Sequence, residues 1–376
     1  MLLFCVVPIA TVLSLGQSID EGLILSLDLM LHWGIPFWVA RRTFVDSATA
    51  VDLMLVVMFL GLLYVPMCLY EIVVGPKYYL QYLLFGEDVM ANPGHTFRMG
   101  GWRPHGMMGN GIRLGRWMTV ATLVTMTLGI ASIPRRDSSP LRSGMPQTTI
   151  WIATGVLFVT TLMTKSFSWL YILAIGTVAL LAFSPALIRR RICCTAIGLS
   201  CAMTLGGMTV RMFDLVDPSP IVRLVERFSP RAAQSLSFRF ESERLFSDKT
   251  LQSSRRWLGN NLQNDFIYPY YSDQRYMMNL KRFGLVGLSL WISTLVIPML
   301  FATWNLWRAN IENFPSIVTF LWCFLAAAIL WDCLFNAFVN PIFLVGCGLL
   351  TNTRQKQAPI TSPGVYRLIR PSFPTS

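Results

Sequence analysis

Apolar runs of roughly the length that crosses a lipid bilayer recur along almost the whole chain. A transmembrane helix needs about 20 predominantly apolar residues and satisfies its own backbone hydrogen bonds, so each run predicts a membrane-spanning helix. The sequence therefore predicts an all-α, polytopic integral membrane protein with about ten transmembrane helices in a single membrane domain, residues 1–350. The predicted helices are Leu2–Leu15, Leu23–Ala40, Leu53–Tyr70, Trp117–Ile133, Thr149–Thr164, Trp169–Ile188, Ile192–Val210, Phe283–Trp304, Pro315–Trp331 and Cys333–Leu350.

The composition excludes a soluble globular enzyme. Hydrophobic residues make up 54% of the chain, charged residues make up 13%, and the mean hydropathy is +0.52. Soluble domains carry about 25% charged residues. A net charge of +12 would indicate nucleic-acid binding in a soluble protein. In a membrane protein the placement of the basic residues matters more, so we expect membrane lipids as partners and no nucleic acid.

The eight cysteines do not form a recognisable metal or disulfide pattern. All of them fall inside the apolar runs, where a thiol behaves as a small hydrophobic group. The adjacent pair Cys193 and Cys194 is more typical of packing within a helix than of redox chemistry. We therefore expect no disulfide framework, no metal site and no cofactor.

The short connections predict the orientation of the chain, because loops rich in arginine and lysine tend to stay in the cytoplasm. Basic residues fall in alternate connections, and the opposite short connection, between the fifth and sixth runs, holds only Lys165. We therefore expect a protein of the cytoplasmic (inner) membrane with both termini in the cytoplasm. Residues 351–376 contain four prolines and four basic residues, which predicts a disordered cytoplasmic tail. The residues that define the alternation are Arg41, Arg42, Arg135, Arg136, Arg142, Arg189, Arg190, Arg191 and Arg308.

Two long polar segments, residues 71–116 and 211–282, are predicted to be extracytoplasmic loops. The second is the large loop between the seventh and eighth runs, and it holds twelve basic residues against eight acidic ones. Two interpretations are open. Long translocated loops escape the charge bias, so the basic residues could be simply solvated. Alternatively, two or three guanidinium groups converge on a phosphate, which their planar array of donors suits.

The first loop ends in a glycine-rich segment, Gly100–Trp117, with six glycines in eighteen residues. This density predicts tight backbone turns, but the order and flanks of a nucleotide-binding P-loop are missing. Arg103, His105, Arg113 and Arg116 are the charged or titratable residues of this segment, and Arg103, His105 and Arg113 are the candidates for contact with a ligand.

The large loop contains two amphipathic stretches that predict helices, Pro220–Phe228 and Ala232–Leu251. In the second stretch Leu236, Phe240 and Phe246 could form an apolar stripe on the bilayer surface. Arg239 and Arg244 would then either extend to the lipid headgroups or face inward towards a ligand.

One ionisable pair lies within a predicted span. Asp28 and His32 are spaced i and i+4, so they share one face of a helix. A carboxylate in mid-membrane costs roughly 2.5–3.5 kcal/mol on insertion scales, so we expect the pair to face the interior of the bundle. A proton relay and a structural pair are both consistent with this spacing.

Several of these segments together resemble the O-antigen ligase and O-antigen polymerase superfamily. WRPHGMMGNGIRLG is similar to that family's arginine-led, glycine-rich segment before a transmembrane helix. SLSFRFESERLFSDKTLQSSRRWLGNN and YSDQRYMMNLKRFGLVGLSLW resemble its large loop and the start of the next span, and LHWGIPFWVARR resembles an early span. The resemblance extends over about Leu23–Leu350, and it rests on order, spacing and topology rather than on any one motif.

The resemblance implies a glycosyltransferase. Such enzymes take a glycan from a polyprenyl pyrophosphate donor and transfer it to a sugar hydroxyl on a lipid or glycan acceptor, at the outer face of the membrane. Matched by position, Arg103 and Arg239 correspond to the family's functional arginines. Further contacts to the pyrophosphate or glycan would come from Arg113, Arg244, Arg256 and His105.

One position departs from the family. Many ligases have a histidine–asparagine pair before the next span, where this chain has Ser272 and Asp273. Asp273 could accept the proton of the acceptor hydroxyl, or it could be an ordinary surface carboxylate. Two other functions stay open from the sequence: a transporter or flippase for a lipid-linked or anionic solute, and a family relative that has lost catalysis.

Overall fold

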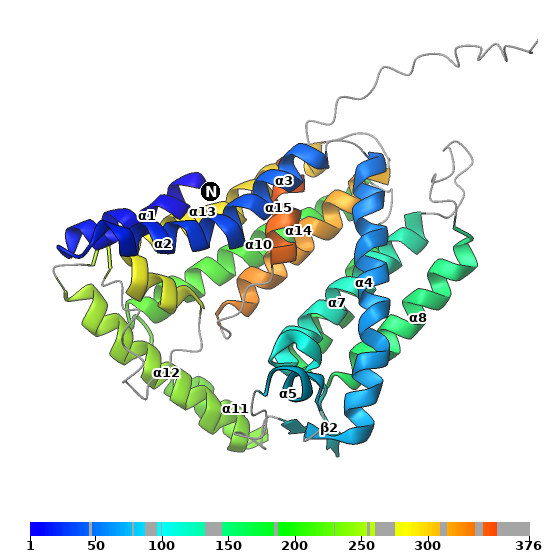
Figure 1. Ribbon diagram of the computed structural model, residues 1–376, viewed down its shortest axis with the longest axis horizontal. Coiled ribbons are helices and arrows are strands. Elements are labelled where there is room, and N and C mark those ends of the chain that lie inside the picture. The colour runs from blue at the N-terminus through cyan, green and yellow to red at the C-terminus, as the bar shows by residue number, and fades with distance from the viewer. Residues whose placement is uncertain are drawn as a thin grey trace, which may run out of the picture.

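The computed structural model describes residues 1–44, 47–76, 79–86, 96–98, 100–131, 145–183, 187–228, 230–253, 256–259, 275–308, 314–334 and 341–351. Within these ranges the chain is almost entirely helical, and the single sheet is a hairpin of two-residue strands (Figure 1). The strands β1 (Phe97–Arg98) and β2 (Gly101–Trp102) pair antiparallel in the glycine-rich segment.

The apolar runs of the sequence coincide with helices. They are α1 (Leu2–Ser14), α2 (Ile19–Leu29), the π-helix η1 (Met30–Gly34), α3 (Ile35–Thr43), α4 (Ser47–Val74), α7 (Gly111–Ala131), α8 (Gln147–Met163), α9 (Phe167–Ala182), α10 (Leu187–Met212), α13 (Arg275–Arg308), α14 (Phe314–Asp332) and α15 (Pro341–Leu350). The loops add α5 (Leu80–Phe85), the 3₁₀ turn η4 (Gly106–Met108), α11 (Ser219–Phe228) and α12 (Pro230–Leu251).

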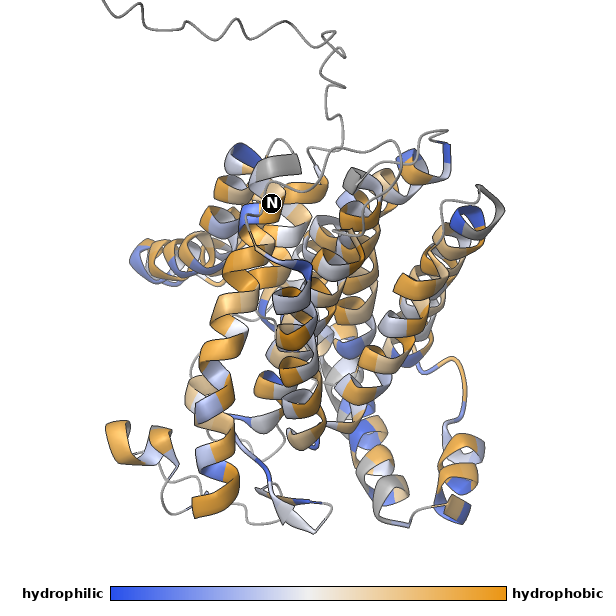
Figure 2. Cartoon of the chain, turned by 90° about the vertical axis from the view of Figure 1, so that its right-hand side faces the viewer, coloured by the Kyte–Doolittle hydropathy of each residue, from blue (hydrophilic) through white to orange (hydrophobic). Residues whose placement is uncertain are grey.

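Five helical segments of the described chain are long and apolar enough to cross a membrane: Ile19–Thr43, Thr49–Val74, Gly111–Ala131, Arg190–Met212 and Tyr276–Arg308. Apolar helices such as α1, α8 and α9 are shorter than the about 20 residues that span the hydrocarbon core. The all-α membrane architecture therefore agrees with the sequence, and the count of about ten spans stays a prediction. Figure 2 shows hydrophobic residues predominating along the long helices, as expected for surfaces that face lipid.

Helix α7 is the centre of the bundle. Seventeen of its residues are buried, and it packs against α4, α8, α9 and α14. Its threonines are buried without losing hydrogen bonds, because Thr122, Thr125 and Thr127 each donate to the carbonyl four residues earlier. Thr122 Oγ1 also lies 2.9 Å from Thr161 Oγ1 of α8, which joins the two helices.

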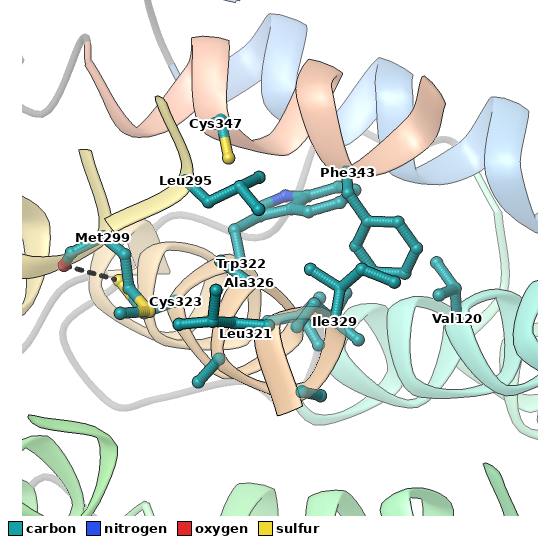
Figure 3. Close-up of a cluster of buried hydrophobic side chains, with 14 of the residues drawn as sticks. Val120, Leu295, Met299, Leu321, Trp322, Cys323, Ala326, Ile329, Phe343 and Cys347 are labelled. Carbon is teal, nitrogen blue, oxygen red and sulfur yellow. Dashed lines mark hydrogen bonds between the residues drawn. The ribbon is translucent and has the colours of Figure 1, made fainter. Parts of the chain in front are cut away.

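A second part of the core joins α13, α14 and α15. Trp322 of α14 lies beside Leu295 and Phe343 of the neighbouring helices (Figure 3). Cys323 Sγ lies 3.7 Å from the carbonyl oxygen of Met299. The eight cysteines are free thiols, and all but Cys193 are buried, as expected of small hydrophobic side chains.

Two glycines, Gly259 and Gly284, join residues 256–259 of the large loop to a break in α13. Gly284 has φ +63°, and a Cβ there would lie 2.4 Å from the carbonyl group of Trp257. Gly259 approaches the carbonyl of Arg282 just as closely. The backbone N–H of Leu285 donates to the Arg256 carbonyl at 2.9 Å. This contact holds residues 256–259 against the bundle.

The Asp28–His32 pair does not face the interior, in contrast to the sequence prediction. The Asp28 and His32 side chains are 59% and 65% exposed, and their carboxylate oxygen and ring nitrogen are 3.0 Å apart. Asp28 lies near the end of α2 and His32 in the π-helix η1 that follows it. The spacing that pairs the two side chains was therefore predicted, but the direction of their face was not.

Candidate functional site

Arg103 is a buried cation that pairs with no carboxylate of the described residues. Its side chain is 2% exposed, and the guanidinium Nε and Nη2 atoms have no hydrogen-bond partner within the described chain. The backbone of the residue is fixed on both sides: its N–H donates to the Thr96 carbonyl at 2.7 Å, and the Tyr79 hydroxyl donates to its carbonyl at 2.5 Å. Its position is therefore determined while its donors stay available.

A buried carboxylate that contacts this segment, Glu71, is occupied by backbone groups. Glu71, at the end of α4, accepts from the backbone N–H of His105 and of Gly106, both at 2.7 Å, and of Leu80 at 3.1 Å. Glu71 thus binds backbone groups on both sides of Arg103 in the chain, at residue 80 and at residues 105–106. These bonds fix the backbone of the segment that carries Arg103. The His105 ring packs edge-on against the ring of Tyr79, with centroids 5.2 Å apart.

The Arg103 guanidinium lies against the first turn of α7. A Cβ on Gly111 would come within 2.3 Å of Arg103 Nε, so only glycine leaves this space open. Gly115 lies one turn further along the same face of α7. There the Ser166 side chain occupies the space that a Cβ would fill, and its buried hydroxyl also has no hydrogen-bond partner within the described residues.

Lys165 brings a second cation to this region. Its Nζ lies 2.3 Å from where a Cβ on Gly101 would be, two residues before Arg103. Lys165 has φ +53°, an uncommon left-handed conformation for a residue with a side chain. The α8–α9 turn that carries Lys165 and Ser166 therefore packs directly on the glycine-rich segment.

The electrostatics of this region favour a bound anion. Burial, together with the nearby charge of Arg98, lowers the pKa of Arg103 to about 9. The N-terminus of α7 adds the positive end of a helix dipole, which is unfavourable for a cation and favourable for an anion. Arg103, Lys165, Ser166 and the start of α7 are hereafter called the anion site.

A second cluster of charged side chains lies at the C-terminal end of α10. Arg211 makes two hydrogen bonds to the Glu243 carboxylate of α12, one of them from Nε at 2.6 Å. Its third nitrogen, Nη1, donates to the Leu334 carbonyl at 3.0 Å, and its guanidinium lies over the Phe240 ring. Glu243 is buried. Burial raises the pKa of Glu243 to about 7, although the charges of Arg211 and Arg239 oppose this.

The end of α14 connects the two regions. Asp332 forms a buried ion pair with Arg116 of α7, and two residues later Leu334 accepts from Arg211. Arg116 also lies over the Trp169 ring at 5.1 Å. Residues 332–334 therefore contact both the N-terminal part of α7, through Arg116, and the C-terminal end of α10, through Arg211.

The structure separates the residues that the sequence grouped together. Arg103 and His105 lie in one cluster, and Arg239 lies near Glu243 in the other. Arg113 is exposed on the first turn of α7. Arg244 is exposed and pairs with Asp214 at 3.1 Å, and exposed Arg256 lies over the Trp257 ring. Asp273 lies outside the described residues.

The predicted apolar stripe of α12 is also corrected. Phe240 is half-buried and lies under the Arg211 guanidinium, and Ala233, Glu243 and Thr250 of α12 are buried. The reason is the ion pair between Arg211 and Glu243, which joins α12 to α10. The Phe246 side chain is not among those described.

Sequence reasoning missed Glu71, Tyr79, Ser166, Arg211, Glu243 and the Arg116–Asp332 pair. For Asp332 a signal was present, because a carboxylate at the end of an apolar run requires a cation when it is buried. For Glu71 and Ser166 no signal existed in the sequence, because their roles depend on a backbone fold and a helix contact.

Comparisons with known proteins identify no family for this chain. No protein-family model, curated protein or solved structure matches the chain. Within the described residues no group of three or more His, Cys, Asp or Glu side chains could hold a metal ion.

Proposed function

We propose that this protein is a membrane glycosyltransferase of the O-antigen ligase or polymerase type, with the anion site holding the diphosphate of a polyprenyl-linked glycan donor. One observation carries the proposal: Nε and Nη2 of the buried Arg103 guanidinium, at the N-terminus of α7, have no hydrogen-bond partner among the residues that the structure describes. A buried cation without a counter-charge is costly, and a bound diphosphate would supply that charge.

The chemistry follows from where negative charge develops. As the glycan leaves the carrier, charge grows on the departing diphosphate. Fixed donors in a partly dry site stabilise this charge without having to reorganise. Arg103, Ser166 and Lys165 would supply those donors. Asp273 stays the proposed base for the acceptor hydroxyl, and Arg239 a proposed second contact to the substrate.

The proposed topology places both long loops at the outer face of the cytoplasmic membrane, with about ten spans and cytoplasmic termini. The structure supports one part of this arrangement. Lys165, in a short connection assigned to the outer face, contacts the glycine-rich segment of the first long loop. Two connections that charge counting assigned to one side of the membrane therefore meet in space.

The test is a mass-spectrometric profile of polyprenyl-linked glycans and surface polysaccharide in cells with the protein, without it, and with Arg103→Ala. The matched control is Arg42→Ala, an exposed arginine of α3 that lies over the Trp38 ring. We expect lipid-linked glycan to accumulate and surface polymer to be lost in the deletion and in Arg103→Ala only. Unchanged profiles in the deletion would contradict transfer and favour a transporter or a non-catalytic relative.

A further inference from the structure

Helix α11 carries an apolar surface that no described part of the protein covers. It begins seven residues after α10 ends at Met212, and none of its ten residues is buried. Its neighbour is α12. Val222 and Val225 are half-buried, whereas Ile221, Leu224 and Phe228 are exposed.

The exposed apolar residues form one ridge. Ile221, Leu224 and Phe228 are spaced by three and four positions, so they lie on one face of the helix, and Phe228 is 83% exposed. The segment before the helix continues the surface, with Phe213, Leu215 and Val216 also exposed. Contiguous exposed patches of this kind mark interaction sites rather than ordinary protein surface.

The opposite face of α11 is basic. Arg223, Glu226 and Arg227 are exposed there, with a net positive charge. A short helix with an apolar ridge and arginines on its polar face is suited to lie in the headgroup region of a bilayer. There the ridge enters the acyl boundary and the guanidinium groups bind lipid phosphates.

The position of α11 agrees with this occupant. The span Arg190–Met212 ends just before the exposed segment, and that span itself exposes Leu199 and Met203 to the surroundings of the bundle. Figure 1 shows α5 and α11 at the same end of the molecule. Helix α5 also exposes apolar residues, among them Leu83 and Leu84. The two helices are thus at the level where a membrane surface would meet the protein.

We propose that α11 is an interfacial anchor that binds the surface of a bilayer containing anionic phospholipid. The anchor holds the start of α12 in place, because α11 packs against α12. Through the Glu243–Arg211 pair, α12 in turn holds the C-terminal end of α10. This inference does not depend on the proposed transferase activity, because it rests on the exposed ridge, its charges and its position after the span Arg190–Met212.

The test uses the full-length protein in nanodiscs with a nitrobenzoxadiazole label on a cysteine introduced on either face of α11. Leu224→Cys places the label on the ridge, and Glu226→Cys is the matched control on the polar face. The unsubstituted protein corrects for labelling of its own cysteines. With doxyl-labelled phosphatidylcholine in the disc, we expect the label at 224 to be quenched at least about twofold more than the label at 226.

Equal quenching at the two positions would overturn the proposal. A blue-shifted label at 224 that the doxyl lipid does not quench would also overturn it, because a second protein copy would then cover the ridge. A second experiment varies the anionic lipid and tests the role of the arginines. Replacing part of the phosphatidylcholine by phosphatidylglycerol should increase quenching at 224, and Arg223→Gln with Arg227→Gln should remove that increase. An increase that survives both substitutions would overturn the role of the arginines.

Discussion

Arg116 and Asp332 form an ion pair inside the helical bundle, although they are 216 positions apart in the chain. Each side chain is about 1% exposed, and Trp169 covers the guanidinium. Removing one member of such a pair leaves an unpaired buried charge, which costs about 3–5 kcal/mol. We therefore expect Asp332→Ala to lower the thermal unfolding temperature of the purified protein strongly.

The double variant Arg116→Met with Asp332→Leu is the control for this pair. Because apolar residues of similar volume replace both charges, it should recover most of the lost stability. A native unfolding temperature in Asp332→Ala would show that the pair does not join α7 to α14.

Gly111 should be essential to the anion site rather than to the fold. A methyl group there meets the Arg103 guanidinium at Nε, so Gly111→Ala displaces the proposed ligand donors. We expect this variant to lose glycan transfer as completely as Arg103→Ala while remaining folded. Gly155→Ala is the matched control, because a Cβ at Gly155 of α8 meets no atom within 4 Å.

In the control variant Gly155→Ala, alanine replaces glycine inside a helix, which stabilises the helix by about 1 kcal/mol. Surface polysaccharide should be normal in Gly155→Ala and absent in Gly111→Ala. Full transfer by Gly111→Ala would show that the position of Arg103 against α7 does not matter.

Gly284 should be essential to the fold. Its left-handed φ and its contact with the Trp257 carbonyl leave no space for a side chain. Gly284→Ala should therefore detach residues 256–259 from α13 and lower the unfolding temperature. Gly198→Ala, at an open position in α10, is the comparison. Limited proteolysis measures the detachment directly: cleavage near residue 258 should accelerate in Gly284→Ala only.

Glu243 should make stability depend on pH. Burial raises its pKa from 4.5 to about 7 in the folded protein. Between these two values the folded chain holds a proton that the unfolded chain releases, so the free energy of unfolding falls as pH rises. The fall ends near pH 7 and amounts to on the order of 3 kcal/mol.

Thermal unfolding from pH 5 to pH 8 measures this effect. Glu243→Gln cannot titrate, so it should lose this part of the pH dependence, whereas exposed Glu226→Gln should keep it. A stability that instead rises with pH only in the presence of Glu243 would mean that the Arg211 charge outweighs the effect of burial.

The sequence predicted the helices better than the contacts between them. Apolar length located α4, α7, α10 and α13, because a helix in lipid depends on local composition. It also located α11 and α12 from their amphipathic pattern. The direction of a helical face was less predictable. Asp28 and His32 are exposed although the pair was expected to face the interior, and Phe240 lies against the guanidinium of Arg211, which pairs with Glu243.

The candidate site was predictable only in part. The sequence singled out Arg103 as a candidate site residue, and its role in binding stays a prediction. The glycine-rich segment was expected to make tight turns. What positions Arg103 was not visible, because Glu71 acts through backbone N–H groups and Ser166 comes from a different connection. Counting cations could not separate buried Arg103 from surface residues such as Arg244, since both are arginines in polar loops.

The most direct test of the central claim is the binding of a short-chain prenyl diphosphate to the purified protein in nanodiscs. Prenyl alcohol is the ligand control, and Arg42→Ala is the protein control. We predict saturable binding of the diphosphate, no binding of the alcohol, and an affinity at least about tenfold weaker in Arg103→Ala, since charge-assisted hydrogen bonds contribute about 1.5–3 kcal/mol. Equal affinities in the native protein and Arg103→Ala would contradict the assignment of the anion site.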